Sequence, residues 1–251
     1  MVFVMNRFFV RPEDVLAGEV VIKSREDIRH ITKVLRLKKG AVLEVSDSEK
    51  WEYTVRLCSV AEDELRGEIV DRQKFSAEPS LRVTLFQGIP KQGKMETVIQ
   101  KSVEIGVHGI VPVFTVRTVV SCGENSAKKT ERWRKIAGEA VKQCRRGIVP
   151  EVGESISFTQ MVDLFGDGRF DVVVFPYENE ETVSIKDVLR SLGEKPANMA
   201  VTIGPEGGFS DDEAETLKNA GTRSVSLGKT ILRTETAGLV AIAMIMYELE
   251  L

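Results

Sequence analysis

Two glycine-bearing segments near the end of the chain have the residue types of a ligand site. The first, Ile203–Ser210, reads Ile-Gly-Pro-Glu-Gly-Gly-Phe-Ser and follows the apolar stretch Met199–Ile203. Ser210 and Glu213 have capping-box spacing, which predicts that a helix begins there. α/β proteins place ligands where a strand, a glycine turn and a helix N-terminus follow one another, because bare backbone amides approach a bound molecule closely. By spacing alone, a tight and well-capped connection is equally possible.

The second segment, Leu227–Ala237, holds the polar cluster Arg233-Thr-Glu-Thr236 between two apolar stretches. The helix predicted to begin near Thr234 is apolar nearly all the way round over residues 237–246, which indicates burial in a core or in a subunit interface. An ordinary core helix explains those apolar residues, but it does not explain the polar cluster in front of them. The cluster is therefore a second candidate site.

A third segment, Gly88–Lys94, fits the pattern GxxxxGK that begins a phosphate-binding loop. Met95 stands where the Mg²⁺-binding Ser or Thr of such a loop belongs, and Pro90 removes one of the backbone amides that would hold phosphate. A nucleotide hydrolase therefore remains only as an alternative function.

Positive charge is concentrated in two segments, although the chain has a formal net charge of -3. Eight Lys or Arg residues lie between Lys128 and Arg146, with Trp133 among them as a candidate for stacking on a base. The second cluster consists of Arg25, Arg29, His30, Lys33, Arg36, Lys38 and Lys39. A solvated helix face is the ordinary explanation of either cluster alone, but two clusters in an acidic chain favour an extended polyanion such as RNA.

The elements that must position these residues fall into two parts. Up to residue 74, alternating apolar and polar residues predict strands at 41–45, 51–57 and 64–70 and a helix over about 26–36, which is typical of a small barrel. Beyond a polar linker, nearly continuous apolar runs alternate with helical periodicity, which predicts an α/β domain with a parallel sheet. The strands are expected at 81–87, 109–114, 171–175, 199–203 and 224–227, and the helices at 95–106, 130–145, 184–192, 210–220 and 234–249. We expect domains at 1–74 and 75–251.

Composition excludes several classes of protein. Hydrophobic residues make up 42% of the chain and charged residues 29%, the balance of a soluble globular protein. No apolar run is long enough to cross a bilayer, and residues 1–7 lack the features of a signal peptide. The three cysteines are far apart, and neither histidine has the neighbours of a hydrolytic triad. We therefore expect a cytoplasmic protein with no bound metal and no membrane partner.

Taken in order, these segments resemble the bacterial uridine-N3 methyltransferases of small-subunit (16S) ribosomal RNA, the RsmE type of the SPOUT superfamily. Ile203–Gly208 and Leu227–Ala237 carry the most specific part of the resemblance, which covers nearly the whole chain. His30–Arg36 resembles the N-terminal signature of the family. Two central blocks are also similar: Pro90-Lys91, Gln100-Lys101, Glu104–Gly106, Pro112 and Arg117, and then Glu139-Ala140, Gln143, Arg146 and Pro150.

The resemblance implies a PUA-like RNA-binding barrel followed by an α/β SPOUT domain, with helices on both faces of a mostly parallel sheet and a deep trefoil knot. It also implies a homodimer formed through the C-terminal domain. The cofactor would be S-adenosylmethionine, bound on loops that end three strands. The implied cofactor-binding residues are Phe175, Pro176, Tyr177, Glu178, Ile203, Gly204, Pro205, Glu206, Gly207, Gly208, Leu227, Gly228, Ile231, Leu232, Arg233, Thr234, Thr236 and Ala237.

Arg233 and Glu235 are the catalytic candidates within this resemblance. Arg233 would orient a phosphate or stabilise the uracil anion, whereas Glu235 is either a general base or a buttress of the loop. We favour the buttress, because a glutamate at a helix start also suits the helix dipole. The target uridine must be unpaired or flipped, since pairing occupies its N3. The expected RNA-binding residues are Arg29, His30, Lys33, Arg36, Lys91, Lys94, Arg117, Arg132, Arg134, Gln143, Arg145 and Arg146. A non-catalytic RNA-binding factor of ribosome assembly remains a further alternative.

Overall fold

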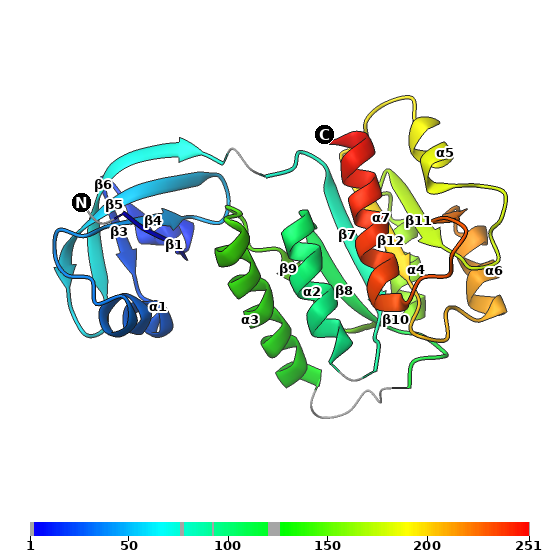
Figure 1. The fold of residues 1–251 in the computed structure, drawn as a ribbon, viewed down its shortest axis with the longest axis horizontal. Coiled ribbons are helices and arrows are strands. Elements are labelled where there is room, and N and C mark those ends of the chain that lie inside the picture. The colour runs from blue at the N-terminus through cyan, green and yellow to red at the C-terminus, as the bar shows by residue number, and fades with distance from the viewer. Residues whose placement is uncertain (1–2, 76–77, 92, 120–125, 251) are drawn as a thin grey trace. The chain divides into compact units, whose positions relative to one another are not determined.

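The computed structural model describes residues 3–75, 78–91, 93–119 and 126–250. The chain forms two compact units: Met1–Glu78 with Val141–Val149, and Pro79–Ala140 with Pro150–Leu251. The chain therefore leaves the first unit, returns to it for Val141–Val149, which we call the return segment, and ends in the second unit (Figure 1).

The first unit is built on a six-stranded sheet in the order β1-β4-β5-β6-β3-β2. β1 pairs with β4 in parallel, and the other neighbours are antiparallel. The strands are β1 (Phe3–Phe9), β2 (Val15–Leu16), β3 (Glu19–Ile22), β4 (Val42–Ser46), β5 (Trp51–Val60) and β6 (Leu65–Lys74). The alternating residues of β4, β5 and β6 were predicted as strands, and they place Leu43, Val55 and Leu65 in one core where each is at most 1% exposed.

The predicted helix of this unit is also present, although it changes type along its length. α1 (Arg25–Arg29) begins at Ser24, whose side chain accepts a hydrogen bond from the amide of Asp27. It continues as a π-helical turn over His30–Val34. Strands β1, β2 and β3, which precede it, have no counterpart among the predicted strands.

The second unit is an α/β domain, as predicted. Its strands pair in parallel in the order β10-β8-β7-β12-β11-β13, with β9 beside β8. They are β7 (Arg82–Gly88), β8 (Gly109–Phe114), β9 (Glu151–Val152), β10 (Ile156–Ser157), β11 (Val172–Pro176), β12 (Asn198–Ile203) and β13 (Arg223–Val225). The helices are α2 (Lys94–Ile105), α3 (Ser126–Cys144), α4 (Phe158–Gly166), α5 (Ile185–Arg190), α6 (Asp211–Asn219) and α7 (Thr234–Leu249).

Helices cover both faces of this sheet (Figure 1). On β7, the ring of Phe86 packs edge-on against Phe165 of α4 at 5.0 Å between centroids. The neighbouring Leu85 and Gln87 instead face Gly238 of α7. Successive residues of a strand point to opposite faces, so α4 and α7 lie on opposite sides of β7. The trefoil knot that the resemblance implies stays a prediction.

The last helix buries only part of its surface within the chain. Ala241, Ile242 and Ile245 are fully buried, whereas Tyr247 is 72% exposed. Among the described residues, no helix is long and apolar enough to cross a membrane.

Candidate active site

The carboxyl ends of β11, β12 and β13 meet around one cavity of about 890 Å³. This volume lies in the range typical of small-molecule sites. The loops that follow these three strands supply most of the wall, and the start of α7 completes it. Parallel α/β sheets bind ligands at this edge, because the strand ends leave backbone groups free of the ladder.

Most of the residues expected to bind the cofactor line this cavity. The exceptions are Phe175, Gly207 and Thr236. Phe175 is fully buried in the core behind the cavity, and the carbonyl oxygen of Gly207 accepts a hydrogen bond from Arg117 at 2.6 Å. Thr236 is exposed in the first turn of α7. The structure thus brings together the three strand-ending loops that the resemblance implies.

The sequence interpretation missed part of the wall. The additional lining residues are Lys94, Glu180, Glu181, Thr182, Ser184, Phe209, Val225, Ser226, Lys229, Thr230 and Glu235; Lys94 and Glu235 had been expected in other roles. Ser184 carried a local signal, because Ser184 and Asp187 form a capping box that marks the end of the loop after β11. The predicted site stopped at Glu178, so the rest of that loop was left out.

Glu180 organises the loop after β11. Its carboxylate accepts hydrogen bonds from the hydroxyl of Ser224 at 2.5 Å and from both the hydroxyl and the amide of Thr182. These bonds, that from Ser224 above all, lower the pKa of Glu180 to about 2. The carboxylate therefore stays charged and ties the loop to β13.

Glycines let the cavity loops pack backbone against backbone. A Cβ on Gly204 would lie 2.7 Å from the carbonyl carbon of Gly208, and one on Gly88 would lie 2.6 Å from the backbone nitrogen of Pro205. Side chains do not fit at such distances, so both positions require glycine.

A buried polar network links β7, the loop after β12 and the start of α7. The Gln87 amide donates to the Thr234 hydroxyl at 2.9 Å, and that hydroxyl donates to the Gly204 carbonyl oxygen at 2.6 Å. Gln87 is fully buried and Thr234 is 7% exposed. Buried polar groups hold one geometry when they are hydrogen-bonded, so this network fixes the position of the glycine turn.

Lys94 lies between two carboxylates at the cavity wall. Its Nζ is 3.3 Å from Oε1 of Glu206 and 3.2 Å from Oε2 of Glu235. The hydrogen bond with Glu235 is the main cause of the raised pKa of Lys94. Burial acts to raise the pKa of Glu235, but its own backbone amide and Lys94 outweigh burial and lower it. Glu235 is thus a charged partner of Lys94 and a weak base, which supports its assignment as a buttress.

Arg233 differs from Lys94 in its surroundings. It precedes the first residue of α7, lines the cavity and is exposed. Within the described part of the chain, its guanidinium makes no ion pair. A cation at the cavity wall without a fixed partner is available to a negative charge that enters or develops there.

The segment that resembled a phosphate-binding loop has a different role in the structure. Gly88 packs against Gly204 and Pro205, and the amide of Lys91 donates to Oε1 of Glu206 at 2.9 Å. Lys94, which would bind phosphate in a nucleotide hydrolase, is held by two carboxylates that would repel a triphosphate. The geometry therefore disfavours the nucleotide hydrolase.

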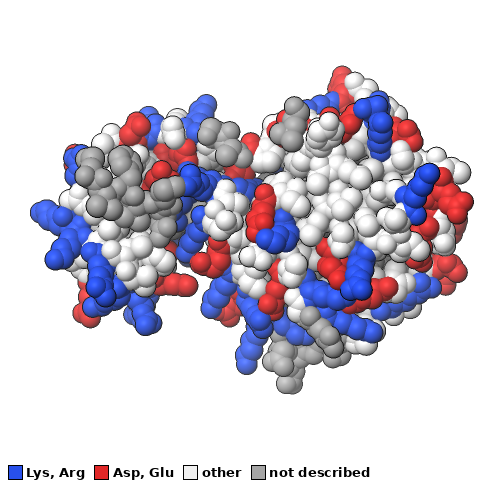
Figure 2. Space-filling model, in the orientation of Figure 1, with Lys and Arg blue, Asp and Glu red and all other residues white. Residues whose placement is uncertain are grey.

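The expected RNA-binding residues of the second unit are largely engaged in ion pairs. Besides Lys94, Arg132 pairs with Glu96 at 2.8 Å and Arg134 with Glu154 at 3.0 Å. On the face of the second unit that Figure 2 shows, Lys and Arg side chains are mixed with Asp and Glu side chains. Trp133 is 6% exposed, so the expectation that it stacks on a base was wrong. On the amphipathic α3 its ring faces the core.

In the first unit, the same comparison separates the exposed Arg145 from the buried Arg146. Arg29, Lys33, Arg36, Gln143 and Arg145 are exposed, and His30 is half-buried, with its ring edge-on to Phe8.

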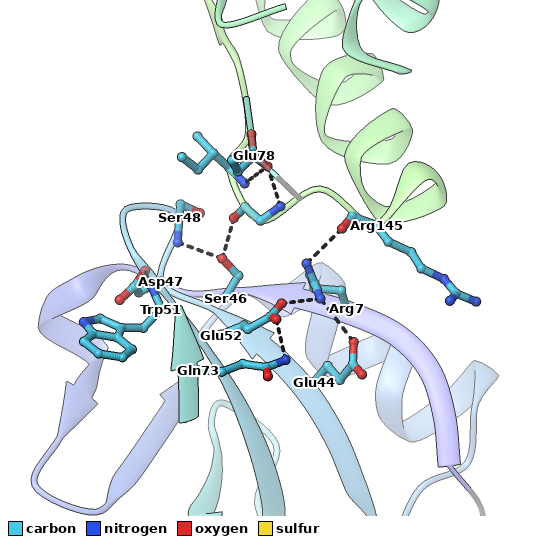
Figure 3. Close-up of polar contacts among 12 residues, drawn as sticks. Arg7, Glu44, Ser46, Asp47, Ser48, Trp51, Glu52, Gln73, Glu78 and Arg145 are labelled. Carbon is cyan, nitrogen blue, oxygen red and sulfur yellow. Dashed lines mark hydrogen bonds and ion pairs between the residues drawn. The ribbon is translucent and has the colours of Figure 1, made fainter. Parts of the chain in front are cut away.

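Arg146 is instead 6% exposed and donates to Glu78 at 2.8 Å. Glu78 also accepts from the amides of Gly147 and Ile148, while Ser46 donates to the Gly147 carbonyl oxygen at 2.5 Å (Figure 3). In this structure Arg146 therefore anchors the return segment and does not present its charge to solvent.

Within the described ranges, no group of His, Cys, Asp and Glu side chains is arranged to hold a metal ion.

Comparisons with known proteins place this geometry in a family. Residues 77–246 match the model of an RNA methyltransferase domain, and residues 24–70 match that of an RNA methyltransferase PUA domain. The ribosomal RNA small subunit methyltransferase E of Bacillus subtilis is 33% identical in an alignment that covers 98% of each chain.

Two solved structures are also similar over nearly their whole length. The ribosomal RNA small subunit methyltransferase E of Neisseria gonorrhoeae, bound to S-adenosyl methionine, has a TM-score of 0.82 at 29% identity, covering 97% of this chain and 98% of that one. A methyltransferase of Legionella pneumophila in complex with the same cofactor has a TM-score of 0.82 at 30% identity, covering 96% of both chains. The chain described here therefore belongs to the ribosomal RNA small subunit methyltransferase E family.

Proposed function

We propose that this protein transfers a methyl group from S-adenosylmethionine to N3 of a uridine in small-subunit ribosomal RNA. The observation that carries the proposal is that the ends of β11, β12 and β13 together form one cavity, with Arg233 at its wall. Two similar solved structures bind the same cofactor, and the curated relatives are named for action on small-subunit ribosomal RNA, which supports both parts of the proposal.

The cavity fits the cofactor in size and in chemistry. Backbone groups of Gly204 and Gly228 suit the adenine and the amino-acid part, since both need hydrogen bonds at close range. Apolar side chains such as Leu227 and Phe209 suit the flat ring, and carboxylates such as Glu178 suit ribose hydroxyls and the positively charged sulfonium and amine. When bound, S-adenosylmethionine supplies an electrophilic methyl group.

The residues of the chain then have to orient the uracil and manage one proton. N3 carries a proton at neutral pH, and its loss leaves negative charge on the ring. Arg233, exposed at the cavity wall, stabilises that charge and orients the base or an adjacent phosphate. Glu235 holds Lys94 and the start of α7 in place. Much of the remaining catalysis is positioning by the glycine loops.

A second copy of the chain is proposed to cover the outer face of α7. Met244 is 36% and Tyr247 72% exposed, and Ile231 in the preceding loop is 82% exposed. Met244 and Tyr247 are three residues apart on α7 and therefore share a face, and large apolar side chains exposed on one helix face favour a protein interface. If the protein is a homodimer through the C-terminal domain, Tyr247→Glu will halve the mass measured by light scattering. An unchanged mass would contradict this.

For the RNA, we propose that the first unit, built mainly from residues 1–74, is a PUA-like RNA-binding domain that acts with the methyltransferase domain of residues 75–251. The exposed cations Arg29, Lys33, Arg36 and Arg145 are its proposed phosphate contacts. In the second unit, Lys91 and Arg117 lie near the cavity through their contacts with Glu206 and Gly207.

The proposal is tested by incubating the protein with small ribosomal subunits, naked small-subunit RNA and large-subunit RNA in the presence of methyl-labelled cofactor. We expect label in the small-subunit RNA only, and far less with Arg233→Ala at unchanged cofactor affinity. Binding of the RNA without any transfer would favour the non-catalytic assembly factor. Equal losses of transfer and cofactor affinity in Arg233→Ala would assign Arg233 to the cavity wall alone.

A further inference from the structure

A second aromatic and basic site lies in the first unit, apart from the cavity. Three cations surround the indole of Trp51: Arg72 at 5.0 Å, Lys50 at 5.7 Å and Lys74 at 6.0 Å from the ring centroid. All three of these residues are exposed, and Trp51 is partly exposed. We call Trp51, Lys50, Arg72 and Lys74 the Trp51 platform.

Strand pairing explains why these side chains gather. Trp51 lies opposite Lys74, and Tyr53 lies opposite Arg72, on the paired strands β5 and β6. Residues two apart on a strand share a face, so Trp51, Arg72 and Lys74 project from the same face of the sheet. Lys50 joins them from the turn that precedes β5.

The turn that carries Lys50 and Trp51 is held rigidly. Asp47 Oδ1 accepts hydrogen bonds from the amides of Glu49, Lys50 and Trp51 at 2.8–3.0 Å. Its Oδ2 accepts from the hydroxyl of Tyr53 at 3.2 Å. Figure 3 shows the Trp51 indole pointing away from the polar contacts of Ser46 and Glu52. Because the turn is fixed, the ring keeps its orientation before any ligand arrives.

No ion pair among the described residues holds the cations of the Trp51 platform. Among the described residues, Lys50, Arg72 and Lys74 form no ion pair, whereas Arg56 and Arg66 on the same two strands pair with Glu68 and with Glu64. Three unpaired cations around one ring repel one another, and the chain as a whole is acidic. A bound anion relieves that repulsion.

We propose that the Trp51 platform binds an unpaired nucleotide of single-stranded RNA, with the base stacked on Trp51 and the flanking phosphates held by Arg72, Lys74 and Lys50. A flat ring beside cations suits this ligand, because single-stranded nucleic acid offers a base and a charged backbone together. The site needs neither cofactor nor catalysis, and it draws on the proposed function only in taking ribosomal RNA as the natural source of that strand.

The experiment uses the full chain and a short oligouridylate without cofactor. The protein has two tryptophans, so Trp133→Phe leaves Trp51 as the only fluorescent indole. We expect oligouridylate to quench this fluorescence and inorganic polyphosphate to leave it nearly unchanged, because polyphosphate has no base to stack. Equal quenching by polyphosphate, or none by RNA, would overturn the stacking.

The charge contribution is measured with two matched double variants. Arg72→Gln with Lys74→Gln should lower RNA affinity about tenfold and reduce the slope of log affinity against log salt by about 1.4, since each phosphate contact on a single strand contributes about 0.7. Arg56→Gln with Arg66→Gln removes the same charge from the same strands and should change neither. Equal effects of the two pairs would refute the platform.

Trp51→Leu should lower affinity by about tenfold or more, and Trp51→Phe, which keeps an aromatic ring, by less. Melting temperatures of each variant show whether the fold is kept. These experiments measure RNA binding alone, without methyl transfer. If the protein binds RNA at the Trp51 platform but transfers no methyl group in the labelling assay, this inference stands and the catalytic proposal is refuted.

Discussion

Gly88→Ala tests whether the loop after β12 depends on backbone contact with β7. The new Cβ would lie 2.6 Å from the Pro205 nitrogen, 2.7 Å from its Cδ and 2.8 Å from the carbonyl carbon of Gly204. Ordinary contact begins at 3.4 Å, so the two segments must separate by about 0.8 Å. Two of the three contacted atoms belong to the backbone and cannot rotate away.

Overpacking of this kind costs about 1–3 kcal/mol, and three contacts below 3.0 Å favour about 3 kcal/mol. For a domain of this size, that corresponds to a fall in melting temperature of about 6–12 °C. Gly204 and Pro205 line the cavity, so we also expect S-adenosylmethionine to bind at least about tenfold more weakly, a change of about 1.4 kcal/mol.

Calorimetric melting and titration of the cofactor measure the two effects. Gly138→Ala is the matched control: a Cβ there meets nothing within 4 Å, and alanine favours the interior of α3. We expect this control to melt at or above the wild-type temperature. A Gly88→Ala protein that matches the wild type in melting temperature and cofactor affinity would refute the reasoning.

Three further predictions concern single polar groups. Thr234→Val removes the hydroxyl that the Gln87 amide and the Gly204 carbonyl oxygen share; the Gln87 amide keeps its hydrogen bond to the Gly88 carbonyl oxygen, so stability should fall by about 1–3 kcal/mol in denaturant unfolding, whereas a loss below about 0.5 kcal/mol would mean that the network does not hold the turn. Arg146→Ala should destabilise the protein by about 3 kcal/mol and Arg145→Ala by less than about 0.5 kcal/mol, because only Arg146 is buried against Glu78. Equal losses of stability in the two variants would contradict the role of Arg146 as the anchor of the return segment. The pKa of Glu180 is lowered from 4.5 to about 2, so its stabilising effect is complete above pH 4.5 and is lost as the pH falls toward 2; the difference in melting temperature between the wild type and Glu180→Gln should shrink over that interval, and a constant difference would contradict the assignment.

Elements with a periodic pattern or a cap were predictable. The runs that became β7, β8, β11 and β12 are apolar because both faces of the sheet are covered, and the capping box at Ser210 and Glu213 is present as predicted. β9 and β10 have two residues each, too few for any period to register. The N-terminal β1 pairs with β4, more than thirty residues away, and nothing local marks that partner.

Part of the site could not be read from residue types. Arg146 was predicted to contact RNA because it lies in a basic segment. Its partner Glu78 is 68 residues away in the sequence, and the two residues come together because Val141–Val149 packs back into the first unit. Trp133 lies in the same basic segment and was a candidate for stacking on a base, but its ring is buried. The glycine loops were recognisable, since close packing of backbone against backbone requires glycine. The position of Lys94 between Glu206 and Glu235 was not, because the three segments that carry these residues come together only in the fold.

The central claim is transfer to uridine N3, and nucleoside analysis tests it most directly. Small-subunit RNA is methylated with labelled cofactor, digested to nucleosides and separated, so that 3-methyluridine, 5-methyluridine and 2′-O-methyluridine are resolved although their masses are equal. We predict that the label is found in 3-methyluridine. Label in either isomer, in another nucleoside or in none would contradict the account.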